Sequence, residues 1–195
     1  MHFERLAIAD VLLITPKRFG DARGYFMETF RQNLFTEYAG DHDFVQDNQS
    51  FSVERGVVRG LHYQVEPRTQ GKLVRCNAGR ILDVAVDIRA GSPSFGQHVT
   101  AELSEANGRL LWIPPGFAHG FCTLTDNTVV SYKVTDYYSP EHDRGLLWND
   151  PDLAIAWPIG TGEETISEKD RKQPRFADLE ACFPVFGDAA HGAPA

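Results

Sequence analysis

The chain has 195 residues, of which 42% are hydrophobic and 24% are charged, as is typical of a single ordinary globular domain. No apolar run approaches the roughly 20 residues that a membrane-spanning helix needs, and the net charge of −8 argues against non-specific nucleic-acid binding. The three cysteines lie far apart without a C-x-x-C spacing, and no export signal opens the chain, so we expect a cytoplasmic protein.

Helical patterns are few. The first covers residues 31–38 (RQNLFTEY), where Leu34 and Phe35 share one side and Gly40 follows the end. The second lies near SEKDRK, where Ser167 can cap the N-terminus. We therefore expect two short helices.

Short strands and turns fill most of the remaining chain. Residues 71–79 and 80–89 predict two strands around a tight Asn-Ala-Gly turn, and a second turn at Asn107-Gly108 separates two further strands. Residues 127–139 form another alternating run. This spacing favours an all-β sandwich or barrel, and the lack of a Gly-rich phosphate loop argues against a dinucleotide-binding fold.

One domain accounts for the patterned part of the chain. We assign it to residues 1–186, because no linker, repeat or low-complexity segment interrupts them. Residues 187–195 (GDAAHGAPA) are small and polar, and we expect a flexible tail there.

The stretch RGLHYQ (residues 59–64) resembles half of a metal site. On an extended strand, Gly60, His62 and Gln64 share one face, and Gly60 would leave room there for a ligand. Arg59 has the opposite parity. If Arg59 and His62 both face a ligand, the backbone there must be bulged or at the start of a strand.

The stretch IPPGFAHGF (residues 113–121) carries a P-x-G-x-x-H spacing that recurs in cupin barrels, where the histidine binds a metal. The partner motif H-x-H is absent, because the chain has His62 and then Gln64. Glu66 lies too close in sequence to supply the later carboxylate. Two histidines without a third ligand make a poor zinc or iron site, so we expect no catalytic metal.

Lys72 and Tyr132 lie in alternating strands, so either side chain can face a barrel interior or the opposite surface. A buried Lys72 needs a ligand or a carboxylate, for which Asp83 is a candidate, whereas the alternative is a solvent-facing lysine. Tyr132 is either a core residue or a proton donor to a ligand.

Several polar and aromatic residues suit a nucleotide. Arg23 and Arg59 fit phosphate geometry, although most arginines are simply solvated. Gln46 and Asn48 share a strand face and can read the edge of a base. Tyr137 and Tyr138 can stack on a base or sugar, or lie at the surface. These alternatives stay open at the level of residues.

Taken together, the motifs resemble the dTDP-4-dehydrorhamnose 3,5-epimerases, the RmlC-like sugar-nucleotide epimerases. The resemblance rests on FGDARGYF, QDNQSFS, GVVRGLHYQ, QGKLVRC, GRILDVAVDIR, WIPPGFAHGF and YKVTDYYSPEHDRGLLWNDP in this order, and it continues to SEKDRKQPRF. It implies a metal-free, cofactor-free, cupin-type antiparallel jelly roll. It also implies a homodimer in which an N-terminal segment crosses to the partner.

The resemblance further implies the roles of individual residues. His62 matches the catalytic base, Tyr132 the acid, Asp170 the carboxylate paired with His62, and Lys72 the group near the C4 oxygen. Substrate contacts are implied at Gln46, Asn48, Arg59 and His119, at Arg23 and Glu28 from the other subunit, and less directly at Phe19, Phe26, Tyr138, Asp143 and Lys169; we add Asp83 as the partner of Lys72.

The implied reaction converts dTDP-4-dehydro-6-deoxy-D-glucose to dTDP-4-dehydro-L-rhamnose, a step of dTDP-L-rhamnose biosynthesis for cell-surface polysaccharide. The C4 ketone of the substrate acidifies C3–H and C5–H, so a base, an opposed acid and a cation at the C4 oxygen suffice without a metal. The rivals are an epimerase acting on one carbon, a 3,4-ketoisomerase, a sugar-binding module, and a metal-dependent cupin enzyme.

Overall fold

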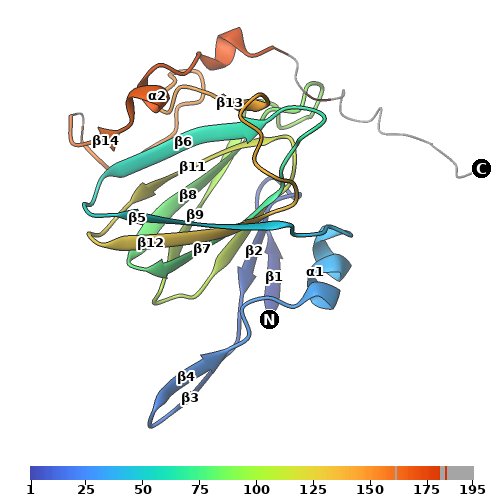
Figure 1. Cartoon of the computed structure of the whole chain (residues 1–195), viewed down its shortest axis with the longest axis vertical. Coiled ribbons are helices and arrows are strands. Elements are labelled where there is room, and N and C mark those ends of the chain that lie inside the picture. The colour runs from blue at the N-terminus through green and yellow to red at the C-terminus, as the bar shows by residue number, and fades with distance from the viewer. Residues whose placement is uncertain (161, 181–182, 184–195) are drawn as a thin grey trace, which may run out of the picture.

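The computed structural model describes residues 1–160, 162–180 and 183. Two sheets face each other, and the chain passes repeatedly from one to the other (Figure 1). The first sheet has the order β1 (His2–Arg5), β2 (Leu12–Thr15), β10 (Leu110–Ile113), β7 (Lys72–Ala78), β12 (Thr128–Val134) and β5 (Gln46–Ser52).

The second sheet carries the histidines. Its order is β13 (Asp143–Gly145), β6 (Val57–Gln64), β11 (Phe117–Thr123), β8 (Arg80–Asp87) and β9 (His98–Ser104). These strands pair antiparallel, and the short β14 (Thr165–Ile166) adds to β6 in parallel. The prediction of an all-β, jelly-roll-type fold is confirmed.

Alternation along the strands builds the core between the sheets. In β7, Val74 packs in the main core, whereas Leu73 points the other way and packs with Phe35 and Trp112 under the first helix. In β8, Ile81 lies in the same main core as Val74, so the facing strands bury one common apolar layer.

Both predicted helices are present. The helix α1 (Gln32–Ala39) ends at Gly40, which has a φ of 92° and donates its N–H to the Thr36 carbonyl. The helix α2 (Glu168–Arg171) begins after Ser167, whose hydroxyl accepts a hydrogen bond from the Asp170 N–H. A 3₁₀ turn covers Phe176–Asp178.

Both predicted turns are also present, but they do not make hairpins. Gly79 (φ 75°) separates β7 from β8, and Gly108 (φ 63°) separates β9 from β10. In each case the two flanking strands belong to different sheets, so these turns carry the chain across the barrel.

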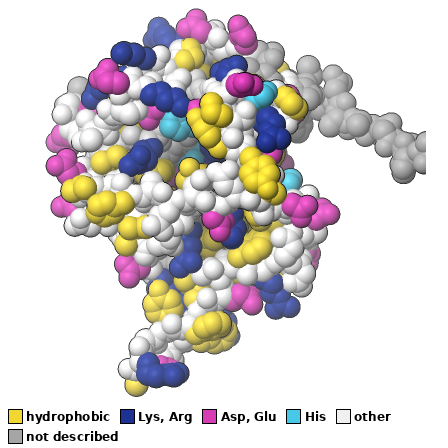
Figure 2. All heavy atoms as spheres, in the orientation of Figure 1, with side chains coloured by type: hydrophobic (Ala, Val, Ile, Leu, Met, Phe, Trp, Pro, Cys, Tyr) yellow, Lys and Arg dark blue, Asp and Glu magenta, His cyan; other side chains and the backbone are white. Residues whose placement is uncertain are grey.

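A separate two-stranded hairpin, β3 (Arg18–Asp21) and β4 (Gly24–Met27), projects from the lower end of the molecule in Figure 1. Hydrophobic side chains gather on it in Figure 2, and Phe26 is 71% exposed. A hairpin this apolar and this exposed is a candidate contact surface.

Other sequence expectations concern the ends of the chain and membranes. Residues 184–186 of the expected domain and the expected tail at 187–195 lie outside the described residues. Within the described part, no helix combines the length and the apolar character needed to cross a membrane.

Candidate active site

A cavity of about 690 Å³ opens between the two sheets. Its wall includes residues from β5, β6, β7, β11 and β12, and from the C-terminal segment that carries α2. The residues singled out in the sequence that lie on this wall are His62, Tyr132, Asp170, Lys72, Gln46, Asn48, Arg59, His119, Tyr138, Asp143 and Lys169.

The strand β6 presents both Arg59 and His62 to the cavity because it contains a bulge. In the register of the two strands, His62 lies opposite His119 and Arg59 lies opposite Phe121. The strand β6 therefore contains one residue more than β11 over this interval. The extra residue reverses the parity, and the predicted bulge is confirmed.

Gly60 has a different role from the one we expected. Its φ is 120°, and a Cβ built on it would lie 2.6 Å from the Gly120 Cα and 2.7 Å from the His119 carbonyl oxygen. The missing side chain therefore allows the backbones of β6 and β11 to approach each other, and does not open space for a ligand.

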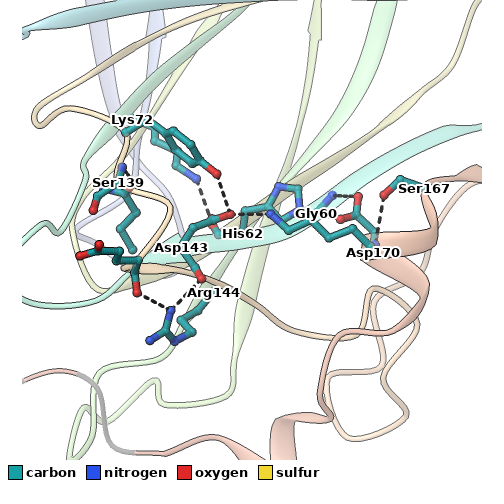
Figure 3. Close-up of polar contacts among 12 residues, drawn as sticks. Gly60, His62, Lys72, Ser139, Asp143, Arg144, Ser167 and Asp170 are labelled. Atoms are coloured by element: carbon teal, nitrogen blue, oxygen red, sulfur yellow. Dashed lines mark hydrogen bonds and ion pairs between the residues drawn. The ribbon is translucent and has the colours of Figure 1, made fainter.

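His62 forms a close pair with Asp170. Its Nε2 lies 2.7 Å from the Asp170 Oδ1, while Oδ2 accepts a hydrogen bond of 3.2 Å from the Gly60 N–H. Burial opposes ionisation of Asp170, but the hydrogen bonds from His62 and Gly60 prevail and lower the pKa of this carboxyl. Figure 3 shows Asp170 on one side of His62 and Lys72 on the other.

This pair is suited to proton transfer. The imidazole side chain is 33% exposed, whereas the Asp170 side chain is only 5% exposed. Nε2 is engaged by the carboxylate, and no hydrogen bond to Nδ1 occurs among the described residues. This arrangement leaves the second ring nitrogen free to act as a base, and the carboxylate would stabilise an imidazolium.

Lys72 points into the barrel, as one of the two sequence alternatives predicts. It is 7% exposed, and its ammonium donates a hydrogen bond of 2.9 Å to the His62 carbonyl. Burial lowers the pKa of Lys72 to about 8, although the charges of Asp143 and Asp83 act in the opposite direction. Lys72 therefore lies beside His62, and its ammonium loses its proton at a lower pH than an exposed lysine does.

Asp83 does not pair directly with Lys72. Its Oδ1 lies 2.7 Å from the His119 Nε2, and its side chain is fully buried. Its Oδ2 has no hydrogen-bond partner within the described part of the chain. Burial lowers the pKa of His119, with Asp83 opposing that shift. Asp83 is not among the residues that line the cavity, and its hydrogen bond to His119 links it to the wall. That Asp83 contacts the substrate stays a prediction.

Tyr132 enters the cavity from the opposite sheet. It lies on β12, between Asn48 of β5 and Val74 of β7, and packs against the main core. Burial raises its pKa, and the charge of Arg59 opposes the shift. Tyr132 therefore keeps its proton at neutral pH, and its position on the sheet opposite His62 suits an acid facing a base.

A polar cluster lies where Tyr138, Asp143 and Lys169 meet. The Asp143 Oδ2 lies 2.5 Å from the Lys169 ammonium and accepts a hydrogen bond of 3.3 Å from the Tyr138 hydroxyl. The hydrogen bond to Asp143 raises the pKa of Lys169. Because Lys169 and Asp170 are adjacent on α2, this cluster is tied to the histidine pair.

Four further expected substrate contacts are not on this cavity wall. Phe19, Arg23 and Phe26 lie on the projecting hairpin, and Glu28 follows it directly. The Arg23 side chain is 90% exposed and pairs with Asp21 of the same hairpin at 2.6 Å. That these residues reach a partner's site stays a prediction.

Sequence reasoning gave no ligand-site role to Gln64 and missed Gln70, although both line the cavity. The shared face of Gln64 and His62 on β6 was a usable signal. Gln70 precedes β7 outside any strand, and no pattern singled it out.

Metal binding was expected to be absent. Among the described residues, no group of three or more His, Cys, Asp or Glu side chains is arranged to hold a metal ion. His62 and His119 each engage a carboxylate through Nε2. A metal-free reaction nevertheless stays a prediction.

The chain resembles known proteins in both sequence and fold. The family model described as dTDP-4-dehydrorhamnose 3,5-epimerase matches residues 5–178. The dTDP-4-dehydrorhamnose 3,5-epimerase of Sinorhizobium fredii is 56% identical over 183 residues, which cover 94% of this chain and 93% of that protein.

Two solved structures are informative. The dTDP-6-deoxy-D-glucose-3,5-epimerase of Legionella pneumophila, in complex with dTDP-4-keto-L-rhamnose, is 45% identical with a TM-score of 0.90, covering 95% of this chain and 98% of that one. A 3'-monoepimerase of Streptomyces bikiniensis, in complex with dTDP-quinovose, is 34% identical with a TM-score of 0.82, covering 91% and 88%.

Proposed function

Because the chain belongs to the dTDP-4-dehydrorhamnose 3,5-epimerase family, we propose that it converts dTDP-4-dehydro-6-deoxy-D-glucose to dTDP-4-dehydro-L-rhamnose, in dTDP-L-rhamnose biosynthesis. The observation that carries the proposal is the His62–Asp170 pair at 2.7 Å, open to a cavity whose opposite sheet supplies Tyr132. Inversion of a carbon needs these two functions on opposite faces of the sugar ring.

The proposed reaction proceeds through an enolate. His62 removes the proton from C3 or C5, the bonding electrons move into the C4 carbonyl, and Asp170 stabilises the imidazolium. Lys72 stabilises the negative charge on the C4 oxygen, as donors do in an oxyanion hole. Tyr132 then delivers a proton to the opposite face of the carbon.

The remaining wall residues are proposed to hold the substrate. Arg59 and Lys169 provide positive charge for the diphosphate, and Tyr138 provides an aromatic face for the nucleoside. His119, on β11, lies opposite His62 of β6 and contacts the sugar in this proposal. The proposal requires no cofactor.

Deuterium exchange tests the proposed roles. With the 4-dehydro sugar in deuterated water, His62→Asn should lose label incorporation at C3 and C5 by roughly 10²- to 10⁴-fold, whereas the exposed His2→Asn should behave like wild type. Tyr132→Phe should slow epimerisation more than exchange. Label retained at both carbons in His62→Asn would exclude His62 as the base.

A single-carbon epimerase is the second candidate, because the fold is shared with a 3'-monoepimerase. The same experiment separates the two: label and inversion at both carbons support the 3,5-epimerase, and label at one carbon supports the alternative. Family membership favours both over the ketoisomerase, the binding module and the metal-dependent enzyme.

We also propose a homodimer in which the β3–β4 hairpin completes the partner's site. The exposure of Phe19, Phe26 and Arg23 supports this proposal. Exposed apolar side chains that gather on one projecting hairpin are typical of a protein–protein contact surface. We propose that the enzyme works in the cytoplasm, in keeping with the free thiols of Cys76 and Cys122.

A further inference from the structure

The segment at residues 136–139 carries Tyr138 to the cavity and lies outside regular secondary structure. It follows the end of β12 at Val134 and precedes β13 at Asp143. A backbone of this kind has N–H and C=O groups that a sheet cannot satisfy, so side chains or water must satisfy them.

Gln64 supplies two of the hydrogen bonds that this segment receives. Its Nε2 donates to the Tyr137 carbonyl at 3.2 Å and to the Arg68 carbonyl at 2.6 Å. Its Oε1 accepts from the Ser139 N–H at 2.7 Å. Gln64 is only 4% exposed, and these partners fix the orientation of its amide, because the carbonyls need a donor and the N–H needs an acceptor.

Two further glutamines act on the same segment. The Gln70 Nε2 donates to the Asp136 carbonyl at 2.8 Å, and the Gln46 Oε1 accepts from the Tyr138 N–H at 3.1 Å. Bonds from glutamine side chains therefore reach every residue from 136 to 139. We call Gln46, Gln64 and Gln70 the glutamine clamp.

The clamp fixes the backbone on both sides of Tyr138 while leaving its side chain accessible. Tyr138 as a whole residue is 54% exposed, and its hydroxyl donates a hydrogen bond of 3.3 Å to Asp143. Both polar atoms of Gln64 are already bonded within the chain, so Gln64 is built to hold this segment and not to contact a ligand. In Figure 3, Ser139 lies beside Lys72 and Asp143, at the end of the site away from Asp170.

We propose that Gln64 and Gln70 are positioning residues that hold Tyr138 in place for the nucleoside end of the substrate. This inference rests on the proposed function, in which Tyr138 contacts the nucleoside. An aromatic ring that is already held binds its partner without losing conformational freedom at the moment of binding. Releasing the clamp should weaken nucleotide binding and leave the proton-transfer groups intact.

Calorimetric titration with dTDP tests the clamp directly. Gln64→Met keeps the approximate size of the side chain and removes its three hydrogen bonds, so the Kd for dTDP should rise by about three- to tenfold. The KM for the dTDP-sugar should rise in parallel, and kcat should stay within about twofold. The matched control is Gln97→Met, an exposed glutamine on a loop before β9, which should leave all three constants unchanged.

A double-mutant cycle shows whether Gln64 acts through Tyr138. The combination of Gln64→Met with Tyr138→Ala should bind dTDP no more weakly than Tyr138→Ala alone, because the ring to be positioned is gone. Additive losses would overturn the proposal. So would an unchanged Kd in Gln64→Met.

Two measurements cover a Gln64 variant that fails to fold. Gln70→Met removes a single hydrogen bond outside the strands, and it should raise the Kd by a smaller factor. In the wild-type protein, the amides of Tyr138 and Ser139 should be protected from hydrogen exchange, and free exchange at both would overturn the clamp. Wild-type protein that does not bind dTDP would count against the proposed function instead.

Discussion

Two histidine–aspartate pairs lie side by side in this protein. They have the same nitrogen–oxygen distance but differ in how far their histidines are exposed. His62–Asp170 and His119–Asp83 both have an Nε2–Oδ1 distance of 2.7 Å, and the two histidines are direct partners across β6 and β11. The His62 side chain is 33% exposed, whereas the His119 side chain is 8% exposed.

The difference lies in where each carboxylate comes from. Asp83 belongs to β8 inside the barrel, so its pair is buried with the core, and burial lowers the pKa of His119. Asp170 arrives on α2 from outside the sheets, which leaves His62 open to the cavity. The same two side chains are thus proposed to serve proton transfer in one setting and a fixed contact in the other.

The largest effect should come from the open pair. Asp170→Asn keeps the shape of the side chain but removes the charge that stabilises an imidazolium, so kcat should fall roughly 10²- to 10⁴-fold. Product formation followed by NMR measures this loss, and circular dichroism checks that the fold is kept. A loss smaller than about threefold would show that the pair is not the base.

A smaller effect should come from Lys72, which donates a hydrogen bond to the His62 carbonyl. Lys72→Met should lower kcat roughly 10²- to 10³-fold, the usual cost of losing an oxyanion donor. In the wild type, kcat/KM should decrease as pH rises through about 8, because burial lowers the pKa of this ammonium and its charge is lost there.

Lys72→Arg provides the control for that pH profile. The guanidinium stays charged, so the alkaline limb should move upward. Burial raises the pKa of Tyr132, so this phenol cannot account for a limb near 8. A wild-type profile flat to pH 9.5, an upper limit about one and a half units above the expected pKa, would contradict the role of the Lys72 charge.

The smallest effect on turnover should come from the closed pair. Asp83→Asn should reduce kcat less than Asp170→Asn does, because Asp83 touches the cavity only through His119. It should instead reduce the free energy of unfolding by about 1–3 kcal/mol, since a fully buried acceptor is replaced by an amide. Urea denaturation measures this change in the free energy of unfolding. Equal stability of Asp83→Asn and Asp170→Asn would remove the distinction between the closed and the open pair.

Local features were predictable because local chemistry determines them. Ser167 caps α2 and Gly40 ends α1, as their sequence positions indicated. The opposite parity of Arg59 and His62 predicted a bulge or the start of a strand, and a bulge is present. The residues on the cavity wall followed from a family resemblance more than from spacing alone.

Features that depend on distant strands were not predictable. Gly60 faces Gly120 of β11, and only the pairing of β6 with β11 shows that the glycine serves this close approach. Asp83 pairs with His119 because β8 lies next to β11. The use of Gln64 depends on a loop that returns to β6 more than 70 positions later along the chain.

The place of α2 in the chain has a consequence for protein synthesis. Every strand of the two sheets except β14 is complete once Gly145 has been made, but the carboxylate that pairs with His62 is residue 170. A chain that terminates between these points contains nearly all the strands of the barrel but lacks Asp170. The carboxylate partner of the proposed base is thus among the last parts of the site to be translated.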